Sequence, residues 1–125
     1  MVVGILGGGQ LARMLALAGH PMGIRCVVLD PADDACSAPV ARHLHGAFDD
    51  RRLLDELADM VDVITYEFEN VPLESLRYLS SKVPVYPPVA ALEATQDRLD
   101  EKNLFRDLGI DTPDFLPVSS QEELE

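Results

Sequence analysis

Apolar and polar positions along the first two thirds of the chain follow two alternating periods, which predict strands separated by helices. Short apolar runs with β-branched residues are typical of buried strands, and they occur at 2–6, 25–30, 44–48, 61–70 and 83–86. Helical spacing of apolar residues predicts helices over 10–18, over 52–60 and after Pro72, and Asp49 or Asp50 can cap the second of these. We therefore expect an α/β fold with a Rossmann-like parallel sheet flanked by helices.

The stretch after Pro87 has a different pattern. Helical spacing predicts two helices, over 89–95 and 97–108, and an apolar run predicts a strand over 114–119. No long run of apolar residues is available to cross a bilayer.

The last residues predict the start of a further helix. Ser119 or Ser120, followed three residues later by Glu122 or Glu123, has the spacing of a capping box. Because the sequence stops at Glu125, just as this helix begins, we expect the chain to be the N-terminal piece of a longer protein.

Charge and cysteine content narrow the class of protein. The chain has 125 residues, 47% of them hydrophobic, and 22 acidic against 10 basic residues give a net charge of -12. Such a surface repels phosphate backbones, so we expect neither a nucleic-acid partner nor an anionic membrane. Cys26 and Cys36 do not form a CxxC pair, which favours reduced thiols and a cytoplasmic location.

A glycine-rich loop, 4-GILGGGQLARM-14, connects the first strand to the first helix. Its backbone N–H groups and the helix dipole favour binding of a phosphate, although the glycines could instead serve only a tight turn. Gly7, Gly9 and Ala12 also fit the dinucleotide pattern G-x-G-x-x-G/A, and Asp30 ends the second strand where an acid would bind ribose hydroxyls. A nicotinamide-dinucleotide domain is therefore one hypothesis.

The segment 65-TYEFEN-70 favours a different ligand. If the strand continues through it, Glu67 and Glu69 point to one face at the carboxyl end of the sheet, where open α/β sheets bind ligands. Two carboxylates beside the amide of Gln10 suit a ligand with hydroxyl and amino groups. Asn70 could contribute to that site or could cap the following helix.

Three motifs together give the chain a family resemblance. The segments 6-LGGGQLARM-14, 62-DVITYEFENVP-72 and 96-QDRLDEK-102 resemble those of the 5-(carboxyamino)imidazole ribonucleotide synthetases, ATP-grasp ligases of purine biosynthesis. The resemblance implies an enzyme that uses ATP, with Mg²⁺, and bicarbonate to carboxylate 5-aminoimidazole ribonucleotide. It also implies a Rossmann-like pre-ATP-grasp domain over residues 1–95 and the beginning of the ATP-grasp region over residues 96–125.

The resemblance also implies roles for individual residues. The expected ribonucleotide-binding residues are Gly8, Gly9, Gln10, Leu11, Glu67, Glu69 and Asn70. Arg98 is expected to approach the ATP phosphates, unless it only forms an ion pair with an acidic neighbour on its own helix. No catalytic residue and no metal ligand is assigned, because ATP and Mg²⁺ would be bound mainly by a C-terminal part.

The full-length relatives are expected to be homodimers, and this chain alone is expected to be inactive. A third hypothesis is a fragment that serves as a subunit interface through Leu73, Leu76 and Leu79, although such a helix face more often belongs to a core. Sister ligases that use formate or phosphoribosylglycinamide should differ from this chain in the TYEFEN segment.

Overall fold

The computed structural model describes residues 1–124 and contains one parallel sheet of four strands. The strands are β1 (Val2–Leu6), β2 (Arg25–Asp30), β3 (Arg42–His45) and β4 (Val63–Tyr66), and their order in the sheet is β3-β2-β1-β4. All neighbouring strands are parallel, as the repeated strand–helix order predicts. The central strand β1 therefore lies between β2 and β4.

Six α-helices accompany the sheet in the described residues. They are α1 (Gln10–Gly19), α2 (Arg51–Met60), α3 (Leu73–Ser80), α4 (Val89–Thr95), α5 (Arg98–Asp107) and α6 (Gln121–Leu124). A short 3-10 helix, His20–Met22, follows α1, and Gly23 ends it with a φ of 73°. Each predicted helix is present, and none of the described helices combines the length and apolar character needed to cross a membrane.

The two faces of the sheet bury two apolar clusters of unequal size. The larger cluster packs Leu6 and Leu29 against Leu54 and Leu57 of α2, and it continues into α3 through Leu76. The smaller cluster packs the opposite face of β1 and β2 against α1, and its members are Ile5, Ala12 and Val28. Alternate residues of a strand face opposite sides, so the sheet is covered on both faces, as in a Rossmann-like fold.

The apolar face of α3 belongs to the larger cluster. Leu76 and Leu79 are fully buried, and Leu73 packs against the same core. This face is not available to a partner, so the interface hypothesis for this helix is wrong. The helix begins after Pro72, whose position is the N-cap, and Asn70 does not cap it.

Two predicted strands are absent or reduced. Residues 114–119 form no strand, because no neighbouring strand in the described chain supplies hydrogen-bond partners there. The predicted strand over 83–86 is reduced to one bridge, between Val85 and Ile64. The third strand lies at Arg42–His45 rather than at 44–48, and β4 ends at Tyr66 rather than continuing to residue 70.

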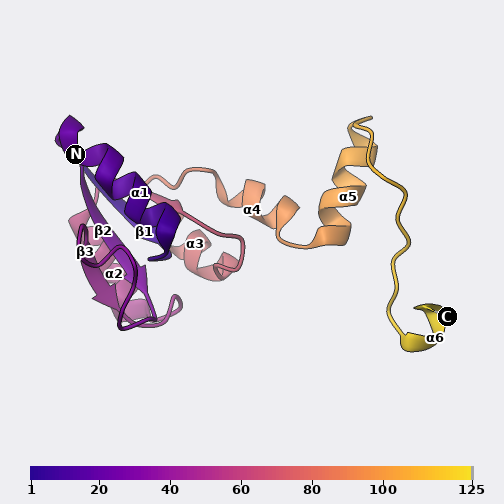
Figure 1. Ribbon diagram of the computed structural model, residues 1–125, viewed down its shortest axis with the longest axis horizontal. Helices are drawn as coiled ribbons and strands as arrows, with labels where there is room; N and C mark the ends of the chain where they lie inside the picture. The colour runs from indigo at the N-terminus through magenta and orange to yellow at the C-terminus, as the bar shows by residue number, and fades with distance from the viewer. Residues whose placement is uncertain (125) are drawn as a thin grey trace.

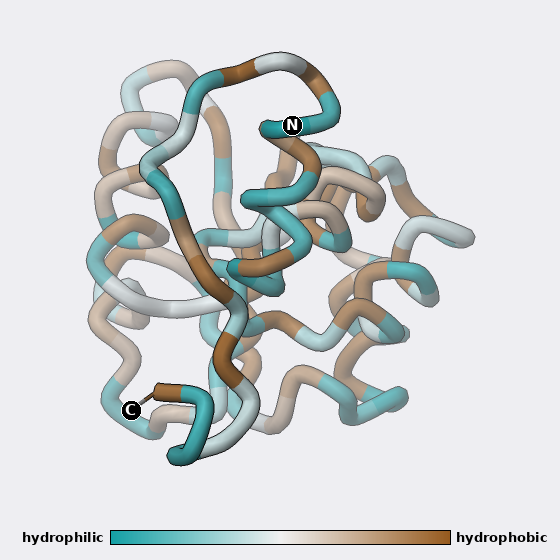
Figure 2. Tube along the Cα trace, turned by 90° about the vertical axis from the view of Figure 1, so that its right-hand side faces the viewer, coloured by the Kyte–Doolittle hydropathy of each residue, from teal (hydrophilic) through white to brown (hydrophobic). Residues whose placement is uncertain are grey.

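The C-terminal residues extend away from the sheet. In Figure 1, α4 leads from the sheet to α5, and the chain then continues to α6 at the far end. We call residues 1–95 the body and residues 96–124 the arm, and no residue of the arm is buried. In Figure 2 the arm is nearest the viewer, and hydrophobic and hydrophilic segments alternate along it.

Candidate functional site

The carboxyl edge of the sheet brings together three segments that are far apart in the sequence. The glycine loop follows β1, Asp30 ends β2, and Glu67 comes directly after β4. Because β1 lies between β2 and β4, both acidic side chains reach the loop from opposite sides. The edge predicted from sequence is therefore the one at which the candidate residues meet.

Glu67 binds the amino end of α1. Its Oε1 accepts the N–H of Gly9 at 2.7 Å, and its Oε2 accepts the N–H of Ala12 at 2.7 Å. Gly9 is the N-cap residue of α1 and has no side chain to cap the helix itself. The carboxylate of Glu67 performs this capping from a distant segment, and its negative charge faces the positive end of the helix dipole.

Asp30 holds the next N–H group of the loop. Its Oδ2 accepts the N–H of Gly8 at 2.6 Å, and its Oδ1 accepts the N–H of Ala32 at 2.8 Å. Both carboxylate oxygens of Asp30 are therefore engaged by the backbone. Asp30 therefore holds the glycine loop in the described structure, a role that the dinucleotide hypothesis did not assign to it.

Two N–H groups at the start of α1 have no hydrogen-bond partner among the described residues. The N–H of Gly7 bonds to the Leu29 carbonyl, and Gly8 and Gly9 donate to the two carboxylates. Within residues 1–124, no acceptor lies within bonding distance of the backbone N–H of Gln10 or Leu11. The loop thus offers an anion fewer donors than a phosphate cradle that uses every N–H of the turn.

Backbone conformation and the close approach of Glu67 explain the glycines at positions 7 and 9 of the loop. Gly7 has a φ of 104°, a conformation that residues with a side chain rarely adopt. A Cβ on Gly9 would lie 2.8 Å from Oε1 of Glu67, which is closer than carbon and oxygen atoms can pack. The glycines therefore admit a carboxylate of the protein itself.

A shallow hollow of about 330 Å³ opens beside this network. Its lining residues come from the loop, from the segment after β2 and from the segment after β4: Gly8, Gly9, Asp30, Ala32, Asp34, Ala35, Cys36, Glu67 and Phe68. Three of them are acidic and none is basic. The lining is therefore suited to hydroxyl or amino groups, which can donate to carboxylates, more than to a phosphate.

The remaining predicted residues of the TYEFEN segment lie in a turn. Since β4 ends at Tyr66, Glu67 and Glu69 do not share a strand face as the sequence predicted. Glu67 is half-buried at the loop, whereas Glu69 and Asn70 are exposed. Burial raises the pKa of Tyr66, the last residue of the strand, so its hydroxyl stays protonated at neutral pH.

Arg98 lies outside this network, at the first position of α5. Its guanidinium forms an ion pair with Glu101 one turn further along the same helix, and its side chain is 75% exposed. The ion pair that the sequence offered as the alternative to ATP binding is thus present. Among residues 1–124, no three His, Cys, Asp or Glu side chains converge to hold a metal ion.

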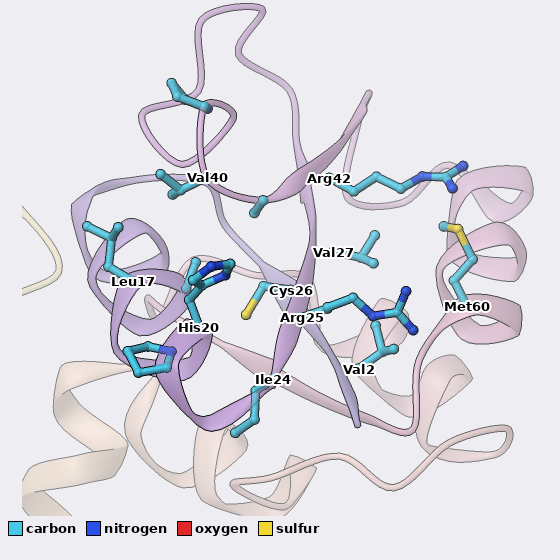
Figure 3. Close-up of a pocket in the computed structure, with 14 residues that line it drawn as sticks. Val2, Leu17, His20, Ile24, Arg25, Cys26, Val27, Val40, Arg42 and Met60 are labelled. Carbon is cyan, nitrogen blue, oxygen red and sulfur yellow. The ribbon is translucent and has the colours of Figure 1, made fainter.

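A larger hollow, of about 850 Å³, lies at the opposite edge of the sheet (Figure 3). Val2, Arg25 and Arg42, the first residues of three strands, contribute to its lining. The figure shows Leu17, His20 and Cys26 on one side of β2 and Val27 and Met60 on the other. None of the ribonucleotide-binding candidates lines it.

Sequence reasoning missed two contacts of the site. The N–H of Ala12 was not considered as a donor, although it is the third residue after Gly9 and a usual target of a capping group. Gln96 was recognised only as part of a motif, but its side chain donates to the carbonyls of Glu69 and Val71. The second contact has no local signal, because it joins residues 25 and 27 positions apart.

Comparisons with known proteins agree on one similarity. Residues 1–96 match the model of the ribonucleotide synthetase preATP-grasp domain. Over its full length the chain is 51% identical to an N5-carboxyaminoimidazole ribonucleotide synthase of Pseudomonas aeruginosa and covers 35% of it. A relative from Brucella melitensis is 46% identical over 98% of the chain, which covers 34% of that protein. The chain thus spans about a third of the length of these relatives.

Solved structures similar to the chain belong to the same family as these relatives. The N5-carboxyaminoimidazole ribonucleotide synthetase of Thermus thermophilus matches 98% of the chain with a TM-score of 0.91 and 51% identity, and 34% of that protein is covered. The Aspergillus clavatus enzyme, solved in complex with ADP and 5-aminoimidazole ribonucleotide, matches 87% of the chain with a TM-score of 0.78 and 35% identity, and 30% of it is covered.

Proposed function

The chain belongs to the ribonucleotide synthetase preATP-grasp family, and from this premise we propose that it forms the ribonucleotide-binding part of an ATP-dependent carbon–nitrogen ligase. The proposed reaction is the carboxylation of 5-aminoimidazole ribonucleotide with bicarbonate in purine biosynthesis. The solved Aspergillus clavatus relative, complexed with ADP and this ribonucleotide, supports the choice of ligand.

The observation that carries the proposal is the position of Glu67. Its carboxylate is held against two N–H groups of α1 at 2.7 Å each, which fixes its direction, and it lines the hollow at the carboxyl edge. Each of its oxygens has a further lone pair available for a ligand donor. In the proposed complex Glu67 accepts a hydrogen bond from the amino or hydroxyl groups of the ribonucleotide.

The phosphate of the ribonucleotide is placed at the free end of the loop. Gln10 and Leu11 supply the N–H groups that no other group in residues 1–124 occupies. Gly8 and Gly9 line the hollow, and in the proposed complex the exposed Glu69 and Asn70 contact the ligand from the β4 side. The contribution of these residues is binding and orientation, which lowers the entropic part of the barrier.

The nucleotide part of the proposal rests on Arg98 and on the relatives solved with ADP or ATP. Arg98, whose side chain is exposed, would exchange its ion-pair partner Glu101 for the ATP phosphates, a contact that a guanidinium makes readily. The described residues do not fit the Mg²⁺ that accompanies ATP in such enzymes, because no suitable cluster of ligands is present in residues 1–124. No step of the proposal passes through the metal.

The proposal also covers the domain boundaries, the cellular location and the oligomeric state of the enzyme. Residues 1–95 form the substrate-binding domain and residues 96–125 belong to the ATP-grasp region, in a cytoplasmic, homodimeric enzyme. The match of the family model to residues 1–96 supports this boundary.

The test is a titration of the isotope-labelled chain with 5-aminoimidazole ribonucleotide, followed through backbone amide shifts. We expect shifts at Gly8, Gln10 and Leu11 and in the segment after β4. Glu67→Gln should weaken binding about 10- to 100-fold, because a charged acceptor is lost. Glu122→Gln, which makes the same change on the exposed α6, should bind as the unchanged chain does.

A parallel titration with reduced nicotinamide cofactor tests the dinucleotide alternative. In the proposed function Asp30 holds the backbone of the glycine loop and does not contact a dinucleotide, so we expect no shift at this residue. Shifts confined to the glycine loop and Asp30 on addition of the cofactor, without a response to the ribonucleotide, would overturn the proposed function.

A further inference from the structure

The side chain of Gln96 connects two of the motifs that carry the family resemblance. Gln96 follows α4 directly, and its Nε2 donates to the carbonyl of Glu69 at 2.7 Å and to the carbonyl of Val71 at 3.1 Å. These two carbonyls lie on either side of Asn70. The carboxamide therefore binds the carbonyls of the residues before and after Asn70, a residue of the proposed ribonucleotide site.

The chemistry of the contact defines the side chain that it needs. Both partners are carbonyl oxygens, which only accept hydrogen bonds, so the NH₂ group of the amide must face them. One NH₂ group has two hydrogens and can serve both carbonyls at once. A glutamate at this position could donate to neither and would add a negative charge beside two acceptors.

The contact joins buried anchors to an exposed turn. The backbone N–H of Gln96 donates to the carbonyl of Leu92, a residue that is 2% exposed, and Val71 is fully buried. Glu69 and Asn70, which come directly before Val71, are exposed and make no side-chain hydrogen bond with other residues of 1–124. Without Gln96 the turn would keep its ends but lose the bonds that fix its peptide planes.

We propose that Gln96 is a positioning residue for ribonucleotide binding, which holds the turn at Asn70 in the conformation that meets the ligand. The inference rests on the proposed function. Arg98, the candidate ATP contact, lies two residues after Gln96 at the start of α5.

The experiment compares ribonucleotide affinity in the 125-residue chain and its variants. Gln96→Met keeps the length of the side chain and removes both donors, and Gln96→Glu adds the repulsive charge. Gln121→Glu, on the exposed α6, is the matched control for the charge. Affinity is measured by calorimetry at a temperature at which circular dichroism shows every variant fully folded, and the amide of Asn70 is followed by NMR relaxation.

We expect Gln96→Met to weaken ribonucleotide binding about tenfold, Gln96→Glu to weaken it further, and Gln121→Glu to stay within about twofold of the unchanged chain. The Asn70 amide should become more mobile in both Gln96 variants before any ligand is added. A merely structural role would lower the unfolding temperature and leave the affinity of the folded chain unchanged.

Two results separate this inference from the proposed function. If the unchanged chain binds the ribonucleotide and Gln96→Met binds it equally well, Gln96 has no positioning role although the site is correct. If the unchanged chain does not bind the ribonucleotide, the proposed function fails, and the role of Gln96 fails with it.

Discussion

The body and the arm each contain a ten-residue helix with an aspartate cap, but only the helix of the body packs against the sheet. α2 in the body and α5 in the arm each have ten residues and begin after an aspartate whose carboxylate accepts two backbone N–H groups. Four residues of α2 are buried against the sheet, whereas α5 buries none. Capping therefore explains where both helices begin, and only packing explains why the body has a fixed tertiary structure.

The largest test of this difference is a matched pair of leucine substitutions. Leu57→Ala removes a fully buried side chain from the larger cluster, and we expect a loss of about 3 kcal/mol in the free energy of unfolding. Leu108→Ala removes a side chain that is 63% exposed in the arm, and the loss should stay below about 0.5 kcal/mol. Urea unfolding followed by circular dichroism measures both, and equal losses would show that the arm packs against the body.

A second pair compares Asp30, whose carboxylate binds the backbone, with an exposed aspartate of the arm. Asp30→Asn leaves one acceptor where two N–H groups, of Gly8 and Ala32, now bond to the side chain. We expect a loss of about 2 kcal/mol in the free energy of unfolding if the amide turns its NH₂ group to the N–H of Gly8, a buried residue, because this donor then loses its partner. Asp114→Asn, in the exposed part of the arm, is the control and should change little. A neutral Asp30→Asn would mean that the glycine loop does not depend on this acceptor.

Substituting the aspartate caps of α2 and α5 distinguishes the stability of the whole body from that of one exposed helix. Asp50→Ala removes the cap of α2, which packs on the sheet, and should lower the free energy of unfolding by about 1 kcal/mol. Asp97→Ala removes the same kind of cap from α5 and should reduce the helical content of the arm while leaving unfolding of the body unchanged. Amide exchange resolves the two regions, and a loss of body stability in Asp97→Ala would contradict this separation.

The smallest expected effects appear at acid pH. Hydrogen bonds from Tyr78 and then Lys82 lower the pKa of Asp55 below its ordinary value of 3.8. Asp55 thus stabilises the folded body above that value, and this contribution is lost as the pH falls through the lowered pKa. Tyr78→Phe should flatten the acid dependence of the unfolding free energy between about pH 5 and pH 2.

The arm offers a control at acid pH too. Hydrogen bonds from the N–H and hydroxyl of Ser119 lower the pKa of Glu123. Its protonation should release this local contact at the start of α6 without changing the stability of the body. NMR titration of the two carboxyl groups checks the directions, and a flat acid dependence in the unchanged chain would remove the role of Asp55.

Local and repetitive signals made most of the fold predictable. The apolar runs at 2–6 and 25–30 become β1 and β2 with those bounds, and the predicted helix over 89–95 is α4. The capping box near Ser119 is confirmed, since Glu123 accepts the Ser119 N–H and donates its own N–H to Ser120. Such features depend on neighbours in sequence, which a pattern can represent.

The errors arose where a distant partner decides the structure. Residues 114–119 have strand-like composition but no neighbouring strand in the described chain, and a strand without a partner leaves its backbone unpaired. The sequence brought Glu67 to the correct edge of the sheet, but its direction depends on the turn after Tyr66. Whether a carboxylate faces a ligand or caps a helix cannot be read from its position in a strand pattern.

The strand order also has a consequence for how the chain acquires its site during synthesis. The ribosome synthesises the glycine loop early, but Glu67, whose carboxylate caps α1 at Gly9, follows 58 residues later. The central strand β1 likewise waits for β4 to complete its pairing. A growing chain that ends before residue 67 therefore has a first helix without this cap and a strand β1 that is paired on one side only, so the hollow at the carboxyl edge is complete only after β4 and Glu67 have been synthesised.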